Sequence, residues 1–346
     1  MAQEPQQSLS GKTLEELQLL VSANNWPDYT ARQIAEWIYK KRVRYIDQMT
    51  NLPKKIREEL ARDYCIEWRE PVDVQTASDG TKKYLFPTHH NGYIESAYIP
   101  DGKRHTLCIS SQVGCRMACS FCMTARQGLQ GQLTAGEILN QVHSLPETDS
   151  LTNIVYMGMG EPFDNLDAVM KSLEILTSAY GYGMSPRRVT VSTIGLIPEM
   201  QHFLENSRCN LAISLHSPFD EERRQLVPMQ KTHPLEEVIG TIERFSMEKQ
   251  RRVSFEYIVF KSLNHSPKHI KALARLLHRI RCRINLMRFH PVPGSDLQSP
   301  DEEIMQSFKT ALEAKGITTT IRKSRGTDIQ AACGQLSTDK KKATKR

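Results

Sequence analysis

Three cysteines lie close together in this 346-residue chain, at a spacing suited to metal chemistry. They are Cys115, Cys119 and Cys122, in the pattern C-x3-C-x2-C. Thiolates are the usual ligands of iron–sulfur clusters, and a [4Fe–4S] cluster held by three cysteines keeps one iron open for a substrate or cofactor. A structural zinc site uses four protein ligands, commonly in C-x2-C pairs, and this run offers no second pair. The spacing therefore favours a cluster over zinc and over unligated core cysteines.

A second candidate binding segment covers residues 157–162, with the sequence MGMGEP. Gly160 would let the backbone approach a ligand closely, and Glu161 could accept hydrogen bonds from an ammonium group. Taken alone, the segment is more typical of a tight turn between a strand and a helix. Further candidates end two later strand-like runs and could line the same rim, although a lone histidine is more often a core or rim residue: Ser192, Ser214, Leu215 and His216.

Two other cysteines lie outside the cluster spacing. Cys108 comes just before the cluster motif, and Cys333 lies near the C-terminus in the run AACG. Both could be buried thiols that pack as small hydrophobic side chains. The small residues around Cys333 favour a mobile, approachable thiol instead, and composition leaves both interpretations open.

The elements that must position these residues alternate between strand and helix patterns from residue 106 onward. Strands are predicted by the runs HTLCISS, NIVYMGM, RVTVSTI, NLAISLH, VSFEYIVF, INLMRFH and TTTIRK. Helices are predicted over 134–144, 165–178, 234–248, 268–280 and 301–315. This alternation predicts an α/β fold with a parallel sheet, closed into a barrel or partial barrel. Functional residues of such barrels gather at the carboxyl ends of the strands, where the candidates above fall.

The earlier part of the chain divides into two segments. Residues 1–64 predict a small helical module, in which Thr13 and Glu16 form a capping box. Residues 65–107 carry Asp-Gly, Asn-Gly and Asp-Gly turns between β-prone runs, which predict a small antiparallel hairpin extension leading into a barrel over 108–336. The basic residues 337–346 are expected to form a disordered tail.

Composition excludes several classes of protein. Hydrophobic residues make up 39% and charged residues 25%, as in an ordinary soluble globular enzyme. The sequence shows neither a membrane-spanning apolar run nor a secretory signal, so a cytoplasmic protein with reduced thiols is expected. The net charge is +7, but five basic residues lie in the final KKKATKR segment. Charge alone therefore only hints at nucleic acid, through this tail and through the basic cluster Lys40, Lys41, Arg42 and Arg44, which is more typical of a solvated face.

Several motifs, in order along the chain, resemble a single family. These are the cysteine triplet and the segments CISSQVGC, MGMGEP, SPRRVTVSTIG, LAISLHSP and DIQAACGQL. The chain is similar to the RlmN-type radical S-adenosylmethionine methyltransferases, which modify carbon 2 of adenine in 23S rRNA and tRNA and are related to the Cfr resistance methyltransferases. The resemblance runs from ANNWPDYTARQIAEWIYKKR to AACGQL. It implies a radical SAM partial barrel, a [4Fe–4S] cluster and two S-adenosylmethionine molecules per turnover.

The resemblance also implies roles for individual residues. Cys333 corresponds to the thiol that first takes a methyl group from one S-adenosylmethionine, giving S-methylcysteine. The 5′-deoxyadenosyl radical formed from the second molecule then activates that methyl group for attack on the base. Cys108 corresponds to the thiol that closes a transient disulfide with Cys333 and frees the product. Glu95 corresponds to the family's proton acceptor, although a strand carboxylate is usually solvated.

On the cofactor side, the resemblance covers the rim residues and leaves one position open. Gly160, Glu161, Ser192, Ser214, Leu215 and His216 correspond to cofactor-binding positions. His290 precedes the Pro-Val-Pro-Gly turn, where many family members have asparagine, so its part in cofactor binding is in doubt.

The implied substrates are adenosine 2503 of 23S rRNA and adenosine 37 of tRNA, and the base must be exposed for carbon 2 to be reached. The N-terminal helices would then be an RNA-binding accessory domain. An electron donor such as flavodoxin or ferredoxin and a monomeric state are further implications. Two alternatives stay open: Cfr-type methylation of carbon 8 of the same rRNA adenosine, and a non-catalytic iron–sulfur protein that binds RNA or senses redox state. Pro162 and the segment RKSRGTDI resemble the carbon-2 enzymes more closely.

Overall fold

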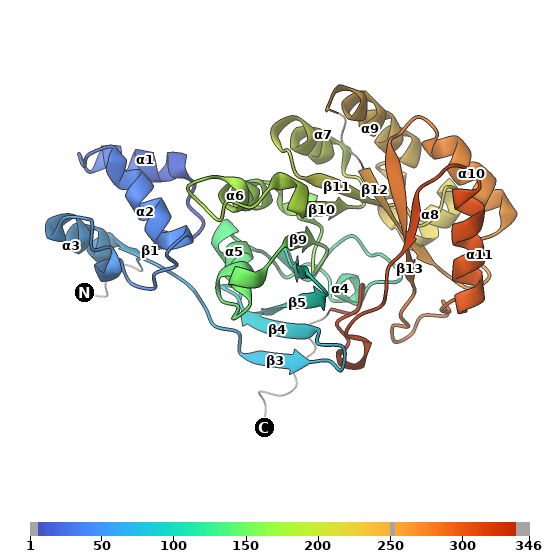
Figure 1. Ribbon diagram of the computed structural model, residues 1–346, viewed down its shortest axis with the longest axis horizontal. Helices are drawn as coiled ribbons and strands as arrows, with labels where there is room; N and C mark the ends of the chain where they lie inside the picture. The colour runs from blue at the N-terminus through green and yellow to red at the C-terminus, as the bar shows by residue number, and fades with distance from the viewer. Residues whose placement is uncertain (1–5, 250–252, 337–346) are drawn as a thin grey trace.

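A small helical module forms one end of the molecule and lies beside the main body (Figure 1, blue). The computed structural model describes residues 6–249 and 253–336, so the predicted basic tail lies outside the described residues. The module comprises β1 (Gln7–Ser8), α1 (Leu14–Ala23), α2 (Tyr29–Tyr39), η1 (Ile46–Gln48), α3 (Lys54–Asp63) and β2 (Tyr64–Cys65). The predicted capping box begins α1: the Thr13 side chain accepts from the Glu16 N–H, and the Glu16 carboxylate accepts from the Thr13 N–H. β1 pairs in parallel with β2, which joins the two ends of the module.

The main body is built on one ten-stranded sheet, in the order β14-β13-β12-β11-β10-β9-β6-β5-β4-β3. Its strands are β3 (Asp73–Thr76), β4 (Lys82–Pro87), β5 (Tyr93–Asp101), β6 (Arg104–Ile109), β9 (Asn153–Tyr156), β10 (Val189–Thr193), β11 (Asn210–Ser214), β12 (Val253–Val259), β13 (Cys282–Arg288) and β14 (Thr319–Ile321). The strands from β6 and β9 to β14 pair in parallel, and β14 lies at an edge of the sheet. The barrel is therefore partial, and the predicted α/β class is confirmed.

The hairpin extension is continuous with the barrel. The predicted turns at Asn91-Gly92 and the two Asp-Gly pairs connect β3, β4, β5 and β6. β6 pairs antiparallel with β5 on one edge and parallel with β9 on the other. The predicted boundary between residues 107 and 108 thus falls inside β6, a strand shared by both parts.

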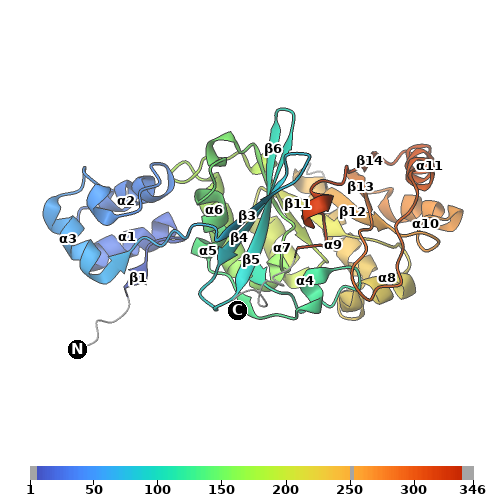
Figure 2. The same cartoon turned by 90° about the horizontal axis from the view of Figure 1, so that it is seen from below.

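Helices follow most of the parallel strands and pack around the sheet (Figures 1 and 2). They are α4 (Met123–Arg126), α5 (Ala135–His143), α6 (Leu166–Thr177), α7 (Ile197–Asn206), α8 (Asp220–Leu226), α9 (Leu235–Lys249), α10 (Pro267–Leu277) and α11 (Glu302–Glu313). The five helices predicted in this region correspond to α5, α6, α9, α10 and α11, whereas α4, α7 and α8 were not predicted. Among the described helices, none combines the length and apolar character needed to cross a membrane.

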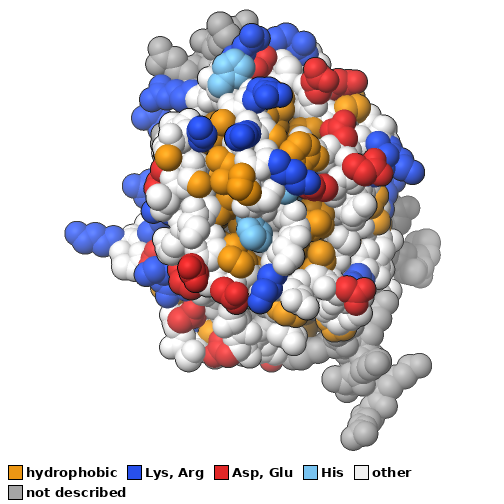
Figure 3. All heavy atoms as spheres, turned by 90° about the vertical axis from the view of Figure 1, so that its right-hand side faces the viewer, with side chains coloured by type: hydrophobic (Ala, Val, Ile, Leu, Met, Phe, Trp, Pro, Cys, Tyr) orange, Lys and Arg blue, Asp and Glu red, His pale blue; other side chains and the backbone are white. Residues whose placement is uncertain are grey.

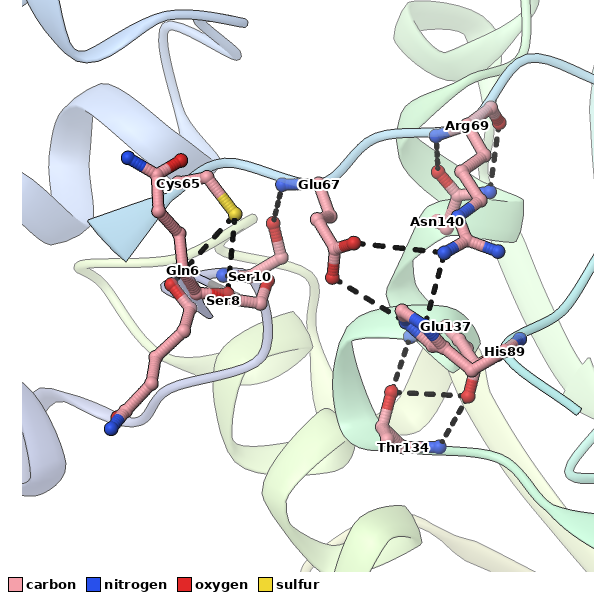
Figure 4. Close-up of polar contacts among 11 residues, drawn as sticks. Gln6, Ser8, Ser10, Cys65, Glu67, Arg69, His89, Thr134, Glu137 and Asn140 are labelled. Carbon is pink, nitrogen blue, oxygen red and sulfur yellow. Dashed lines mark hydrogen bonds and ion pairs between the residues drawn. The ribbon is translucent and has the colours of Figure 1, made fainter. Parts of the chain in front are cut away.

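Polar contacts around α5 join the module and the following linker to the main body (Figure 4). The Arg69 N–H donates to Asn140 Oδ1 at 2.8 Å, and Asn140 Nδ2 donates to the Arg69 carbonyl at 2.9 Å. The Glu67 N–H donates to Ser10 Oγ at 3.1 Å, which ties the linker to the module. A cavity of about 430 Å³ lies beside these contacts and contains none of the predicted site residues.

Much of the predicted basic cluster is engaged in ion pairs. Lys40 pairs with Glu36 on the same helix, and Arg44 pairs with Glu70 of the linker. Arg42 reaches Asp149 of η2 (Thr148–Ser150) at 2.7 Å, across to the main body. The arginines of this cluster therefore help to dock the module.

Candidate active site

The carboxyl ends of the parallel strands surround a cavity of about 160 Å³. Most of the predicted site residues line it, although they come from distant parts of the sequence: Cys108, Cys115, Cys119, Cys122, Gly160, Glu161, Ser192, Ser214, His216 and Cys333. Glu95, Leu215 and His290 do not line this cavity. Because one strand end contributes after another, the parallel sheet itself brings these residues together.

The cluster motif forms a tight loop after β6. Gly114 has φ +74°, and a Cβ there would lie 1.8 Å from the Gly128 carbonyl oxygen, so the close approach requires glycine. The Cys115 N–H donates to that same oxygen, and the Cys122 N–H donates to the Cys119 carbonyl. These bonds fix the loop so that its thiols face the cavity.

The environment of the three thiols fits a bound cationic cluster. Burial raises the pKa of Cys115 to about 12, and it raises the pKa of Cys119 and of Cys122 as well. Each thiolate would also repel its neighbours, so the charged forms need a cation, and coordination deprotonates a thiol outright. Within the described residues, no three Cys, His, Asp or Glu side chains are placed to hold one metal ion. Thiols that ligate different irons of a cubane need not converge on one point. We conclude that the donor set fits a [4Fe–4S] cluster better than a single zinc ion.

The MGMGEP turn depends on glycine at two positions. A Cβ on Gly158 would lie 2.7 Å from the Ile109 carbonyl oxygen, and one on Gly160 would lie 2.6 Å from Cβ of Gln112. Gly160 also has φ +99°, which disfavours other residues. The turn therefore packs directly on the start of the cluster loop.

Glu161 has a buried carboxylate that ties two strand ends together. It accepts hydrogen bonds from the N–H of Phe163 at 3.1 Å and of Ile194, just after β10, at 3.0 Å. Burial raises its pKa to about 7, although these hydrogen bonds act to lower it. The Thr193 side chain is a third hydrogen-bond partner of this carboxylate. Since a carboxylate offers about four acceptor positions, one position is left for an ammonium donor from the cavity.

His216 is held in one orientation and one tautomer. It adopts φ +57°, and its Nδ1 accepts the Ile258 N–H at 3.1 Å. Burial lowers its pKa to about 3, so the ring is neutral and carries its proton on Nε2. The Phe121 ring packs edge-on against it, with centroids 4.7 Å apart. His216 therefore presents a fixed environment at the β11 end of the cavity.

The side chain of Leu215 is fully buried in the core. Its N–H donates to the Glu256 carbonyl at 2.9 Å, and its own carbonyl accepts from Arg223 Nε at 3.2 Å. Any contact of Leu215 with a cofactor would thus involve its backbone. Arg223, which was not predicted, also donates to the carbonyl oxygens of Ile194 and Ser214 and so ties β10 to β11.

The two outlying cysteines meet at the wall of the same cavity. Cys108 is buried in β6, in an apolar cluster that includes Ala331, and Cys333 is exposed. The C-terminal segment that carries Cys333 is fixed by the Met123 N–H, which donates to the Gly334 carbonyl at 2.8 Å. All eight cysteines are free in this structure.

Arg322 and Glu256 also line this cavity, and neither belongs to a recognisable local motif. Arg322 lies 3.5 Å from the Glu256 carboxylate, which accepts a hydrogen bond from Asn285 at 2.7 Å. Burial raises the pKa of the Cys108 thiol to about 12, and the positive charge of Arg322 opposes that rise. Glu256 is a charged residue inside an otherwise apolar strand run, which is a weak signal, whereas Arg322 directly follows β14 and has no such signal.

The remaining two candidates do not line the cavity. Glu95 lies on β5, buried in an ion pair with Lys83. His290 follows β13 and is half-buried, and burial together with the charge of Arg288 lowers its pKa. The roles implied for both residues stay predictions.

The fold and the cysteine loop define a class of protein: residues 109–277 match the family model described as the radical SAM superfamily. Residues 7–66 match a second family model, the ribosomal RNA large subunit methyltransferase N-terminal domain. A crystal structure of a radical SAM methyltransferase from Sphaerobacter thermophilus is 41% identical, with a TM-score of 0.88 over 95% of this chain and 99% of that one.

Relatives of known family match almost the whole chain. A probable dual-specificity RNA methyltransferase RlmN from Bacteroides thetaiotaomicron is 53% identical over 96% of each chain. The dual-specificity RNA methyltransferase RlmN of Nautilia profundicola is 42% identical over 90% of this chain and 92% of its own. The chain therefore belongs to the RlmN family of dual-specificity RNA methyltransferases, and neither the carbon-8 nor the non-catalytic alternative is favoured.

Proposed function

We propose that this chain is a radical methyltransferase that adds a methyl group to carbon 2 of adenosine in RNA, with Cys333 as the methyl carrier. The observation that carries this proposal is the shared cavity. Cys333 and Cys108 line the same cavity as the triplet of Cys115, Cys119 and Cys122. A protein that only bound RNA or sensed redox state would not need two further thiols there.

Cys115, Cys119 and Cys122 would hold a [4Fe–4S] cluster. When bound, the cluster supplies the electron for reductive cleavage of S-adenosylmethionine at its open iron. Glu161 can accept hydrogen bonds from the ammonium group of that cofactor, and the Nε2–H of His216 is a potential donor. Ser192 and Ser214 add hydroxyl groups at the adjoining strand ends.

The exposed Cys333 thiol is suited to take the first methyl group, because an external sulfonium can reach it. Cys108 then resolves the product. Its thiolate attacks Sγ of Cys333, an S–S bond forms, and the bond between Sγ and the methylene carbon breaks with its electron pair left on carbon. Arg322 stands beside this exchange as a cation that favours the Cys108 thiolate.

Glu95 is assigned the proton from carbon 2, because it lies on the strand next to Cys108 and on the same face of the sheet. Two molecules of S-adenosylmethionine would be used in each turnover, one for Cys333 and one for the radical. A low-potential flavodoxin or ferredoxin is the class of donor that fits the cluster.

The proposed substrates are adenosine 2503 of 23S rRNA and adenosine 37 of tRNA, with the protein acting as a monomer. The N-terminal module is the proposed RNA-docking part, in keeping with its match to an rRNA methyltransferase N-terminal domain. At the opposite end of the molecule, the face in Figure 3 mixes basic and acidic side chains around hydrophobic ones. A mixed surface of this kind is less suited to an RNA backbone.

The direct test uses nucleoside mass spectrometry. The gene is expressed in bacteria that lack their own enzyme, and 23S rRNA and tRNA are digested and compared with synthetic 2-methyl- and 8-methyladenosine. The proposal predicts 2-methyladenosine in both RNAs, and its loss when Cys333 is changed to alanine. Recovery of 8-methyladenosine as the main product, or of neither nucleoside, would contradict it.

A further inference from the structure

A buried ion pair lies on the hairpin part of the sheet, next to the reaction cavity. Lys83 Nζ on β4 is 3.2 Å from Glu95 Oε1 on β5, and each side chain is only 9% exposed. No local motif in the sequence marked Lys83. Because burying two charges usually costs more than it returns, such a pair calls for an explanation other than stability.

The strand register places Lys83 in line with the resolving thiol. Lys83 is the cross-strand partner of Ala97, and Ala97 is the partner of Cys108. Cross-strand partners point to the same face of a sheet, and neighbouring strands are about 4.8 Å apart, so Lys83 lies about 10 Å from Cys108 along one row. Ala97 and Cys108 pack against Ala331, so this is the face covered by the segment that carries Cys333.

Because the side chain of Ala97 is small, it leaves space on this face of the sheet for the longer side chains of Lys83 and Glu95. From its position beside Ala97, Lys83 reaches diagonally to Glu95, whose own cross-strand partner is Leu85. The Glu95 backbone is fixed as well, because its carbonyl accepts from Ser110 Oγ at 2.6 Å. Lys83 therefore holds one carboxylate oxygen of Glu95, whose backbone is itself fixed on β5. This contact lies beside the cross-strand row of Lys83, Ala97 and Cys108.

A buried carboxylate can accept a proton only if it is ionised, and burial disfavours the ionised form. A carboxyl group removed from water without a cation favours its neutral form, which has no acceptor position for another proton. A neighbouring ammonium reverses this preference and keeps the carboxylate ionised. The same contact holds the carboxylate in one orientation, which a base within hydrogen-bond reach of its substrate requires.

We propose that Lys83 is a positioning residue for Glu95, which holds the Glu95 carboxylate ionised and oriented so that it can take the proton from carbon 2 of the substrate adenine. The inference rests on the proposed function. In the step itself, the proton moves from carbon 2 to a Glu95 oxygen, and the electron pair of the C–H bond stays on the base. Lys83 keeps its own protons throughout.

The chain offers a matched control on the same strand. Lys82 points to the opposite face and pairs with Glu147 at 2.6 Å, away from the thiols. Lys82→Met therefore removes one lysine charge and one ion pair from β4 without touching the proposed pair. Lys83→Met removes the cation from Glu95, and Lys83→Arg keeps a cation there.

The first experiment needs no turnover. Infrared spectra of the purified full chain at neutral pH are compared for the C=O stretch of a protonated carboxylic acid. Glu161, with a pKa of about 7, contributes to this absorption in every variant, so the spectra are compared as differences from the wild type. We expect an additional band in Lys83→Met that is absent from the difference spectra of Lys83→Arg, Lys82→Met and the double variant Lys83→Met/Glu95→Gln. A spectrum of Lys83→Met without this band would overturn the proposal.

The second experiment separates the two halves of the reaction in the anaerobically reconstituted enzyme, with S-adenosylmethionine, a reductant and a tRNA substrate. We expect Lys83→Met to methylate Cys333 normally, to form 2-methyladenosine about tenfold more slowly or worse, and to accumulate a covalent protein–RNA species. Lys83→Arg should recover most of the rate, and Lys82→Met should match the wild type. Equal loss of both halves in Lys83→Met would assign the lysine to folding and overturn the proposal. A wild-type enzyme that forms no 2-methyladenosine would instead contradict the proposed function itself.

Discussion

For single residues of the cavity, removal from water changes the pKa of the polar groups. Glu161 is the clearest case, because burial raises its pKa to about 7 from an ordinary 4.5. The folded protein therefore binds this proton more tightly than the unfolded chain does. Ionising Glu161 consequently costs stability in the protein without cofactor.

This environment predicts a pH dependence for the metal-free chain. As pH rises from 4.5 to about 7, the free energy of unfolding of the wild type should fall relative to that of Glu161→Gln, which has no proton to lose there. Urea unfolding of both proteins across this range measures the difference. A difference that stays constant or reverses sign would show that the carboxyl is not desolvated as described.

The cluster ligands give a second prediction at this scale. After anaerobic reconstitution, the wild type should carry about four iron atoms, and Cys119→Ala should lose most of them because one of three protein ligands is gone. Cys65→Ala removes a thiol from the N-terminal module and should retain the iron. Iron and sulfide analysis with visible absorption gives the readout. Stoichiometric zinc in place of iron would contradict the assignment.

Site residues that belong to a motif with a characteristic spacing could be predicted from the sequence, whereas site residues outside any motif could not. The spacing of Cys115, Cys119 and Cys122 indicated a cluster before any fold was known. Lys83 and Arg322 carry no such signal, because each lies beside another basic residue in the sequence and its acidic partner is on another strand. Cys108 and Cys333 were singled out because they lie outside the cluster spacing, but their roles were assigned only through the family resemblance.

For the elements of the fold, local sequence patterns predicted the strands of the sheet, but they did not predict every helix or every strand pairing. Apolar runs and the Asp-Gly and Asn-Gly turns predicted the strands from β3 to β14 that build the sheet. The sequence did not show that hairpin and barrel share one continuous sheet, because β6 joins them by pairing with β9, which lies far along the chain. α7 was missed although Met200, Phe203 and Leu204 give it a buried helical face.

The turn after β9 should depend on glycine at position 160. Gly160→Ala should weaken binding of S-adenosylmethionine and lower stability by roughly 1–3 kcal/mol, because the new Cβ would collide with Gln112. Gly183→Ala is the control, since Gly183 also has positive φ but nothing within 4 Å of an added Cβ. Calorimetry of binding and denaturant unfolding compare the two. Equal effects on cofactor binding would mean that the close approach to Gln112 is unimportant.

At the scale of the whole molecule, the module and the main body meet through two glycines. A Cβ on Gly136, at the start of α5, would lie 2.6 Å from the Ser10 carbonyl oxygen, and one on Gly11 would lie 2.3 Å from the Gly136 nitrogen. The contacts of Arg69 and Glu67 lie along the same junction (Figure 4). The module is thus seated by close backbone contact that a larger residue would prevent.

Gly136→Ala should therefore loosen the module without reaching the cavity. We expect faster proteolysis of the linker between β2 and β3 and RNA binding weakened several-fold, while Cys333 methylation continues. Gly240→Ala is the control, because Gly240 lies within α9 with nothing within 4 Å of an added Cβ, and alanine there should stabilise the helix by about 1 kcal/mol. RNA affinity unchanged in Gly136→Ala would argue against the module as the RNA-docking part.

In the proposed reaction, Cys333 carries the methyl carbon to the base and Cys108 releases it, so a variant without Cys108 should trap the covalent intermediate. Cys108→Ala enzyme is reconstituted anaerobically, incubated with S-adenosylmethionine, reductant and tRNA, and digested with protease and nuclease for mass spectrometry. We expect a peptide in which the Cys333 sulfur is joined through one methylene carbon to adenosine, and no such peptide from Cys333→Ala. Unmodified Cys333 together with free methylated RNA would contradict it.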